Sequence, residues 1–391
     1  MLSESKPFKN KKLIKYQNPY FIGSEIKNLQ LTLKSKELIG PESFISKCET
    51  LLETQLLCKK VLLTASGTDA LEMACILANF KKNDEIIIPS FNFPSAATAI
   101  IRCSATPVFA EINSSDMNIS LKSIKKSISP NTKGIILTHY AGISAQISEI
   151  MVLAKKYNLV VIEDAAQAIY SKHKNKYLGT IADFGVLSFH QTKNIFCGEG
   201  GALLINRKKF INRAHIIREK GTNRNDFLKG KINKYGWVDI GSSFLPSSLQ
   251  ASFLYTQLCD GLKITKKRKV IFQNYHKFFS NILKHYNIDI PKVCSHKEIN
   301  GHFYWILVPP EKREEFIKKA RSNLLELTTH FEPLHDTKPG KNFGKIYDNL
   351  SKTKKLAKQI IRVPIHTQMT KKDQTLVLKV LTNIFKECLK N

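Results

Sequence analysis

The chain has 391 residues, 42% of them hydrophobic, and a formal net charge of +29. Its length exceeds the usual size of one hydrophobic core and therefore predicts a large domain with a smaller one. No stretch reaches the roughly 18 consecutive apolar residues of a membrane helix, and the lysine-rich start Met1 to Lys15 lacks the apolar core of a signal peptide, so we expect a cytoplasmic protein without membrane insertion.

The positive charge is the feature that would suit a nucleic-acid partner. Most of the basic residues are lysines spread along the whole chain, whereas a protein that reads a DNA groove is expected to concentrate arginines and aromatics in one element. We therefore expect solvated lysines and no nucleic acid, with a surface for polyanions or anionic membranes as the alternative. The densest basic cluster, Lys266-Lys267-Arg268-Lys269, is interpreted as the wet face of a helix.

The eight cysteines are scattered without a CxxC motif or a Cys/His ligand cluster. Several lie within apolar runs, where a free thiol behaves as a small hydrophobe. We expect neither a disulfide framework nor a metal site.

In the first half of the chain, strand-like apolar runs alternate with helical patterns such as Thr68 to Phe80 and Ile147 to Tyr157. Seven such runs predict a mostly parallel sheet with helices on both faces. The runs are Val61 to Thr64, Glu85 to Pro89, Thr106 to Glu111, Gly134 to Thr138, Leu159 to Glu163, Gly185 to Phe189 and Ala202 to Asn206.

Residues 207 to 250 are rich in glycine and predict loops, and a long helical stretch follows from about residue 251. Fewer and more separated strands come next, His302 to Val308 and Leu327 to His330, before a last helix, Lys371 to Lys390. The expected fold class is α/β, with a large domain over residues 1–250, built on the seven-stranded sheet after an N-terminal segment, and a smaller α+β C-terminal domain over residues 251–391.

The first candidate site motif is the segment Thr64-Ala65-Ser66-Gly67-Thr68-Asp69, which follows a predicted strand and opens a helix. Such a turn directs backbone N–H groups and a partial positive charge at one point, which suits a phosphate group. The alternative interpretation is ordinary N-capping of the helix.

The second motif is Asp164, directly after the predicted strand Leu159 to Glu163. A carboxylate at the carboxyl end of a buried strand lies where α/β proteins bind ligands. Gln167 follows three residues later and could donate to a ligand oxygen. Both residues could instead cap the next helix.

The third motif is Lys193, which lies between a predicted strand and the glycines Gly198, Gly200 and Gly201. A lysine at the mouth of a parallel sheet can form a Schiff base with the aldehyde of pyridoxal 5'-phosphate (PLP), and a carboxylate such as Asp164 can hold the pyridine nitrogen protonated. Ser188 and His190 flank the lysine. The order of phosphate turn, carboxylate and lysine therefore predicts a PLP enzyme.

Together these residues closely resemble the fold type I PLP enzymes and, within them, the DegT/DnrJ/EryC1/StrS sugar aminotransferases. The resemblance covers nearly the whole chain. It is carried by Ser66 to Leu71, Pro89-Ser90-Phe91-Asn92-Phe93, Glu163 to Gln167, the Lys193 segment, and His330-Phe331-Glu332-Pro333-Leu334-His335.

A closer likeness, to the dTDP-4-amino-4,6-dideoxygalactose transaminases, is visible in His139 to Gly142, Arg218 to Arg224 and Asp239 to Phe244. It implies transfer of the amino group of L-glutamate to the 4-keto carbon of dTDP-4-keto-6-deoxyglucose, with the product used for lipopolysaccharide or another cell-surface polysaccharide. It also implies a homodimer with shared active sites, in which the Gly221 to Phe244 region of one subunit closes over the cofactor of the other.

The resemblance assigns roles to individual residues. Lys193 would be the catalytic lysine that bonds to the cofactor and moves the proton in both half-reactions. Other side chains would hold the cofactor, Asp164 at the pyridine nitrogen, Gln167 at the phenolic oxygen, Phe93 on the ring, and Gly67, Thr68 and Ser188 at the phosphate. Ser243 stands where many relatives place an Asn on the partner's phosphate, while His330, His335, Lys220 and Arg224 are implied near the substrate.

Three alternatives stay open at this point. A transaminase of another keto sugar, UDP-linked or with a 3-keto group, would have the same motifs. A 3-dehydratase of this fold would carry His where Lys193 stands. A PLP-fold regulator would use the positive charge, although the phosphate turn by residue 67 leaves no room before it for an appended helix-turn-helix segment.

Overall fold

A computed structural model describes residues 13–35, 43–282, 286, 288–294 and 296–389. Its centre is an eight-stranded sheet in the order β1-β9-β8-β5-β4-β2-β3-β12, in which only β9 runs against its neighbours. The strands are β1 Val61–Thr64, β2 Glu85–Pro89, β3 Thr106–Ala110, β4 Thr132–Thr138, β5 Val160–Asp164, β8 Phe184–Ser188, β9 Gly201–Ile205 and β12 Lys345–Ile346.

The seven strands expected from the sequence are therefore confirmed, with ends that differ by at most two residues. The eighth, β12, pairs in parallel with the edge strand β3 and comes from the C-terminal third of the chain. Two residues give no readable alternation of apolar and polar side chains, so only the tertiary contact with β3 defines this strand.

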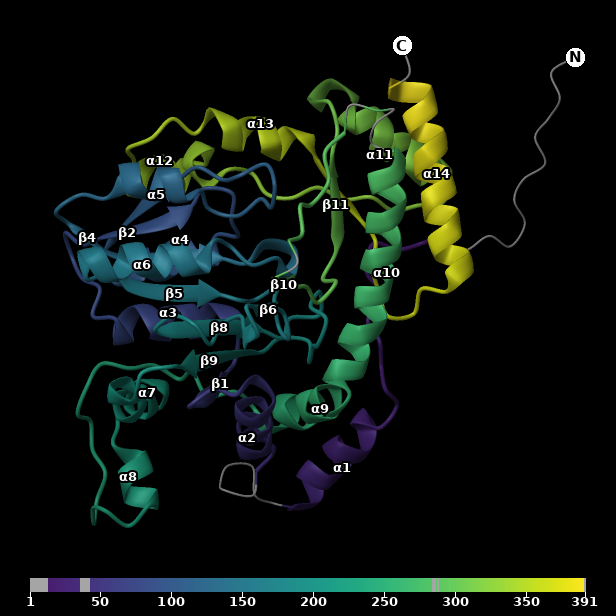
Figure 1. The fold of residues 1–391 in the computed structure, drawn as a ribbon. Helices are drawn as coiled ribbons and strands as arrows, with labels where there is room; N and C mark the ends of the chain where they lie inside the picture. The colour runs from purple at the N-terminus through teal and green to yellow at the C-terminus, as the bar shows by residue number, and fades with distance from the viewer. Residues whose placement is uncertain (1–12, 36–42, 283–285, 287, 295, 390–391) are drawn as a thin grey trace, which may run out of the picture.

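Helices cover both faces of the sheet, as Figure 1 shows. Alternate residues of each strand point to opposite faces, so Ile86 and Ile88 of β2 join one core while Ile87 joins another. On the first face lie α3 Gly67–Leu77, α4 Ser95–Arg102 and α7 Ile211–Arg218; on the second lie α2 Phe44–Leu56, α5 Leu121–Ser127, α6 Ile147–Tyr157 and α9 Ser248–Cys259.

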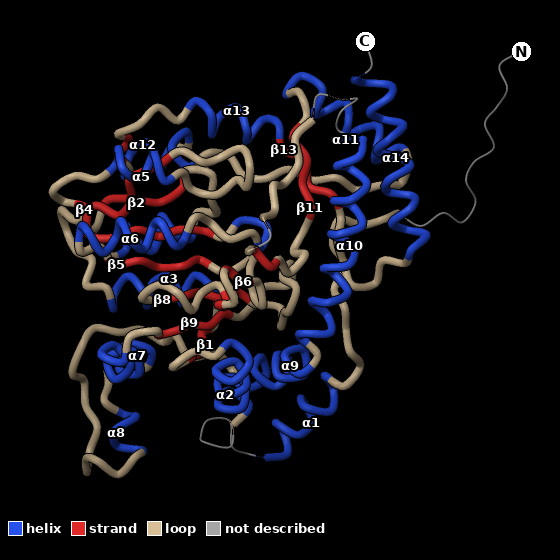
Figure 2. The backbone as a smooth tube through the Cα atoms, viewed as in Figure 1, coloured by secondary structure: helices blue, strands red, loops and turns tan. Residues whose placement is uncertain are grey.

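A separate core lies beside the sheet, where the antiparallel pair β11 Tyr304–Leu307 and β13 Ile360–Val363 packs against helices. Figure 2 shows these helices, α10 Gly261–Ile282, α11 Arg313–Ser322 and α14 Lys371–Leu389, grouped at one side of the molecule. The N-terminal segment also belongs here, because Ile14 bridges to Leu325 and Tyr16 is buried in this core. The expected last helix is confirmed through Leu389, and Lys390 lies outside the described residues.

Short elements complete the chain. A small sheet, β10-β6-β7, joins Lys297–Glu298 to the hairpin of Lys172–His173 and Lys176–Tyr177. The remaining helices are α1 Glu25–Ser35, α8 Arg224–Leu228, α12 Lys338–Phe343 and α13 Ser351–Gln359, with 3-10 turns at Tyr140–Gly142, Lys208–Phe210, Pro310–Lys312 and Leu334–Asp336.

Several local expectations were wrong. Residues 327–330 form no strand, because only Thr328 pairs, in an isolated bridge to Arg362. The helical stretch after residue 251 is two helices with a break at Asp260, where Gly261 packs against the ring of Tyr170 so closely that a Cβ would lie 2.6 Å from its hydroxyl. The region 207–250 is loop-rich as expected and also contains the short helices α7 and α8.

The basic cluster on α10 is also not uniformly solvated. Arg268 is only 5% exposed and donates from Nε and Nη2 to the carbonyls of Gly301 and His302, at 3.2 and 2.6 Å. Burial lowers the pKa of this guanidinium to about 10. Sequence alone misplaced it because the carbonyls that hold it lie more than 30 residues away along the chain.

The division of the chain at residue 250 stays a prediction. It falls next to α9, whose Ala251, Leu254 and Leu258 pack with Cys48 and Leu52 of α2 beneath the large sheet. No helix among the described residues is long and apolar enough to cross a membrane.

Candidate active site

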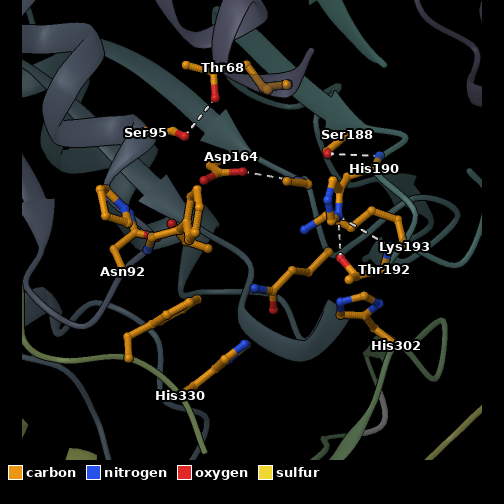
Figure 3. A pocket seen from close by; sticks show the side chains of 18 of the residues that line it. Thr68, Asn92, Ser95, Asp164, Ser188, His190, Thr192, Lys193, His302 and His330 are labelled. Carbon is orange, nitrogen blue, oxygen red and sulfur yellow. Dashed lines mark hydrogen bonds between the residues drawn. The ribbon is translucent and has the colours of Figure 1, made fainter. Parts of the chain in front are cut away.

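A pocket of about 860 Å³ opens at the carboxyl ends of the parallel strands, between the sheet and the second core. Parallel sheets bind ligands at this edge because polar loop residues and helix N-termini meet there. Figure 3 shows side chains from both parts of the molecule around it. Of the residues expected from the sequence, the pocket is lined by Gly67, Thr68, Phe93, Asp164, Gln167, Ser188, Lys193 and His330.

One end of the pocket is the N-terminus of α3. Ser66 caps the helix by accepting the N–H of Asp69 at 3.1 Å. The N–H groups of Gly67 and Thr68 belong to the first helical turn, where no carbonyl within the helix can accept them, so they are free to hold an anion. The hydroxyl of Thr68 contacts that of Ser95 at 2.7 Å, and Ser188 lines the same pocket.

Only glycine fits at position 67. A Cβ there would lie 2.9 Å from Cβ of Ser188, a distance that real side chains do not adopt. The absence of a side chain keeps the helix N-terminus open to a group that enters the pocket. A phosphate could enter this turn, and Ser66 also caps the helix, so the structure agrees with both interpretations of the motif.

Asp164 is the last residue of β5 and is 7% exposed. Its neighbours in the sheet are Thr138 at the end of β4 and Val186 in β8, and its Oδ1 accepts the N–H of Ala166 at 3.1 Å. Burial raises the pKa of this carboxyl, and the bond from Ala166 and the charge of Lys193 oppose that rise. A positively charged group in the pocket would therefore favour the ionised form.

Lys193 stands in a tight turn between β8 and β9. The turn is fixed by backbone bonds from Lys193 N–H to the carbonyl of His190 at 2.9 Å and from Gln191 N–H to that of Gly198 at 2.8 Å. Gly198 has a φ of +88°, which glycine adopts without strain. Burial lowers the pKa of the lysine, and Asp164 partly offsets this shift. A larger fraction of neutral amine is therefore present near neutral pH, as a base or nucleophile requires.

Gln167, Phe93 and His330 complete the part of the site that the sequence identified. Gln167 lines the pocket, and its Oε1 accepts the N–H of Ala141 at 2.7 Å, which orients the amide so that its nitrogen can donate. Phe93 is 60% exposed at the pocket and its ring lies 6.2 Å from that of Phe331. His330 stacks on Phe331 at 3.9 Å.

Four predicted residues do not line this pocket. His335 is buried beneath it and contacts the hydroxyl of Ser90. Ser243 is exposed and forms a bridge with Glu219, while Arg224 pairs with the carboxylate of Glu219 at 2.9 Å. Lys220 lies close to these residues, since its backbone N–H donates to the carbonyl of Ser242. These four residues therefore do not line the pocket of their own chain, although the resemblance places them near the cofactor or the substrate.

The sequence missed several residues that line the pocket, among them Tyr16, Asn92, Ser95, His302 and Arg362. Asn92 and Ser95 flank Phe93, so the motif that contains Phe93 was a usable signal for them. Tyr16 and Arg362 lie 346 residues apart and meet through a bond from Nη1 to the tyrosine hydroxyl at 2.9 Å. No local pattern could have joined these two.

The residues present fit PLP. The helix N-terminus and hydroxyls suit its phosphate, Asp164 suits the pyridine nitrogen, and Lys193 suits the aldehyde. A further observation supports a polar ligand, because the buried side-chain nitrogen of Asn92 at the pocket wall finds no hydrogen-bond partner within the part of the chain that is described. The described residues of the whole chain contain no cluster of three or more His, Cys, Asp or Glu side chains that could bind a metal ion.

Comparison with known proteins agrees with this chemistry. Residues 20–382 match the sequence model of the DegT/DnrJ/EryC1/StrS aminotransferase family. An uncharacterized protein of Methanocaldococcus jannaschii is 30% identical over 374 residues, which cover 93% of this chain and 95% of that protein. GDP-perosamine synthase of Escherichia coli is 28% identical over 331 residues, covering 83% of this chain and 86% of that enzyme.

Among solved structures, the aminotransferase TlmJ of Streptoalloteichus hindustanus is similar to this chain, with a TM-score of 0.87 at 21% identity, covering 96% of this chain and 99% of that one. This likeness confirms the expected fold type I architecture.

Proposed function

The chain belongs to the DegT/DnrJ/EryC1/StrS aminotransferase family, and from this premise we propose that it moves the amino group of L-glutamate to the keto carbon of a nucleotide-linked sugar. It is an aminotransferase that uses PLP. The observation that carries the proposal is one pocket lined by Lys193, Asp164 and the N-terminus of α3.

Two side chains divide the chemistry in this proposal. When bound, PLP supplies an aldehyde that exchanges amino groups and a ring that withdraws electrons. Asp164 holds a proton on the ring nitrogen through its ionised carboxylate. Lys193, with its pKa lowered by burial, accepts the proton from Cα of the amino donor and later delivers a proton to the sugar carbon that receives the amino group. Lys193 delivers this proton to one face of the sugar carbon, and that face sets the configuration at the carbon.

The proposed acceptor is dTDP-4-keto-6-deoxyglucose, with dTDP-4-amino-4,6-dideoxygalactose as product. Support for amination at C4 comes from relatives named UDP-4-amino-4,6-dideoxy-N-acetyl-beta-L-altrosamine transaminase and dTDP-4-dehydro-2,3,6-trideoxy-D-glucose 4-aminotransferase. The same names and GDP-perosamine synthase differ in the nucleotide. A UDP-linked sugar is therefore one alternative acceptor, and a 3-keto sugar, which the sequence motifs also allow, is the other.

A homodimer with shared active sites belongs to the same proposal. Three polar residues lie outside the pocket of their own subunit, namely Lys220, Arg224 and Ser243. They belong to an excursion, residues 220–244, that includes α8 and projects from the large domain (Figure 1). Trp237 in this excursion is 82% exposed, an unusual position for a large apolar ring in an isolated subunit. A second subunit that packs on the excursion would cover that ring and receive the polar residues.

We further place the reaction in the cytoplasm and its product in a cell-surface polysaccharide. A relative 26% identical over 388 residues is named spore coat polysaccharide biosynthesis protein SpsC in Bacillus subtilis. The absence of a membrane-crossing helix among the described residues fits an enzyme that meets its nucleotide sugar in water.

A substrate panel tests the proposal. Purified protein loaded with PLP is incubated with L-glutamate and dTDP-, UDP- or GDP-linked 4-keto sugars, and the products are read by mass spectrometry. Amination of the dTDP sugar, at a rate well above the others, is expected. Amination of only a UDP- or GDP-linked sugar would correct the acceptor. If none of the sugars is aminated and none causes release of 2-oxoglutarate, the result would contradict sugar transamination.

A further inference from the structure

The turn Asn300-Gly301-His302 joins the two catalytic loops. The side-chain nitrogen of Asn300 donates to the carbonyls of Gln167 and Ile169, both at 3.0 Å, on the loop that follows Asp164. Its backbone carbonyl accepts the side-chain nitrogen of Asn194, the neighbour of Lys193, at 3.1 Å. One turn from the second core thus contacts the loops of both Asp164 and Lys193.

This turn is also anchored on its far side. The buried guanidinium of Arg268 on α10 donates to the carbonyls of Gly301 and His302. Gly301 has a φ of +63°, and a Cβ there would lie 2.6 Å from the backbone of α10 at Arg268. The turn therefore has little freedom, and His302 is presented to the pocket in a fixed orientation.

The hydrogen bonds determine which nitrogen of His302 carries the proton. Asn194 donates through Nδ2 to the carbonyl of Asn300, so its Oδ1 is the acceptor that faces Nδ1 of His302 at 2.9 Å. Nδ1 must then carry the hydrogen, and Nε2 is left with a lone pair. Figure 3 shows the His302 ring at the edge of the cavity, below Lys193 and Thr192.

The charges around the ring keep it neutral. Burial and the surrounding cations, Lys193 first, then Arg268, His330 when protonated, and Arg362, all lower the pKa of His302 well below its usual value. His302 and Lys193 line the same pocket, and a lone pair on a neutral ring can accept a hydrogen bond from the ammonium form of a lysine.

We propose that His302 is a positioning residue for Lys193: its Nδ1–H holds Asn194 and thereby the lysine loop, and its Nε2 accepts a hydrogen bond from the ε-ammonium group whenever that amine is protonated and not bonded to the cofactor. The proposal rests on the proposed function for its place in the reaction. It gives the lysine a fixed resting position from which the proton is passed on.

Two substitutions separate the two bonds. His302→Asn retains a donor at the position of Nδ1 and removes the acceptor at Nε2. His302→Gln places an amide oxygen near the position of Nε2 and removes the bond to Asn194. Their thermal stability shows whether each variant folds, so a variant that fails to fold is recognised and the other still decides.

The first measurement needs no turnover. Cofactor-free protein is labelled with acetic anhydride across a pH series, and the extent of acetylation at Lys193 relative to the exposed Lys234 is read by peptide mass spectrometry. Loss of an acceptor destabilises the ammonium form, so His302→Asn is expected to lower the pKa of Lys193. His302→Gln is expected to leave that pKa near the wild-type value and to melt at a lower temperature.

The second measurement is the half-reaction of PLP-loaded protein with L-glutamate, followed by the visible absorbance of the cofactor. We expect it to slow by about tenfold in His302→Asn, less than the roughly 100- to 10,000-fold contributed by a side chain that itself transfers the proton, because Lys193 is still present. An unchanged pKa of Lys193 in His302→Asn, or equal pKa shifts in both variants, would overturn the proposal. Wild-type protein that fails to react with L-glutamate would instead contradict the proposed function, and the labelling result would still test His302.

Discussion

At the scale of single residues, burial does most to prepare Lys193 and Asp164. It lowers the pKa of the lysine and raises that of the carboxyl, and the charge that each would carry opposes the shift of the other. Asp164 ends β5, and Lys193 lies in the turn that follows β8, the neighbour of β5 in the sheet. The backbone therefore fixes the relative position of the two residues before any ligand enters.

Replacement of Lys193 by Ala is expected to abolish transamination while leaving the fold intact, because the residue lines the pocket and its loop is fixed by backbone bonds. The measurements are turnover, the visible absorbance band of the lysine-bound cofactor, and thermal unfolding. We expect loss of the first two and a melting temperature near that of wild type. Sugar amination near the wild-type rate would sink the assignment.

Asp164→Asn should still bind PLP but lose activity by about 100-fold or more, the size seen when one electrostatic catalytic group is removed. A neutral amide cannot hold the ring nitrogen protonated. Cofactor binding is measured by absorbance titration and activity by the half-reaction with L-glutamate. Normal turnover by the variant would mean that the carboxylate only accepts the N–H of Ala166 and has no catalytic role.

At the scale of elements, the junction between β1 and α3 forms the end of the pocket that we propose for the phosphate. Its geometry depends on the end of β8 and on the glycine turn before β9, since a Cβ at Gly201 would lie 2.3 Å from the carbonyl of Ser66. Three segments distant in sequence thus meet within van der Waals contact. A substitution in any of these three segments is therefore expected to change the affinity for the cofactor.

Gly67→Ala tests this element. The added methyl would lie 2.9 Å from Cβ of Ser188, and overpacking of this kind costs about 1–3 kcal/mol. If that cost falls on the bound state, the dissociation constant of PLP rises by roughly 5- to 150-fold. Thermal unfolding shows whether the variant folds. PLP affinity equal to that of wild type, measured by absorbance titration, would argue against a phosphate site at this turn.

At the scale of the whole molecule, the pocket lies between two cores, so its far wall comes from parts of the chain remote from the sheet. Tyr16 from the N-terminal segment and Arg362 from β13 meet there, with the guanidinium 4.4 Å from the ring centroid. The excursion with Trp237 lies apart from this wall and leaves a large apolar ring exposed. The proposed second subunit would cover this ring.

Mixed subunits test the shared site. Lys193→Ala lacks the base, and Ser243→Asp would bring a negative charge to the phosphate of the partner, so each homodimer is expected to be inactive. After equal mixing and subunit exchange, half of the dimers are mixed and each has one intact site, which predicts about a quarter of wild-type activity.

Sedimentation and intact-mass analysis of tagged subunits verify that exchange has occurred. Exchange without recovered activity, full activity of Ser243→Asp alone, or a fully active monomer would each count against a shared site.

Much of the fold and the central residues could be predicted from local sequence. The seven strands are runs of four to seven residues whose apolar side chains enter cores on both faces, a pattern that is visible without any partner. Lys193, Asp164 and the turn at Gly67 were identifiable because strand ends, glycines and small residues must follow one another in order along the chain. Each of these three motifs consists of residues that are close together in the sequence.

Tertiary structure alone decided the features that depend on distant pairs. Arg268 looked like one more solvated lysine-rich position until the carbonyls of Gly301 and His302 buried it. Residues 327–330 had a strand-like pattern but found only one bridge, through Thr328. The orientation of His302 follows from Asn194 and Asn300, which local sequence could not connect. Burial and hydrogen-bond partners are set by the packing of remote segments, and so they appear only when the chain is folded.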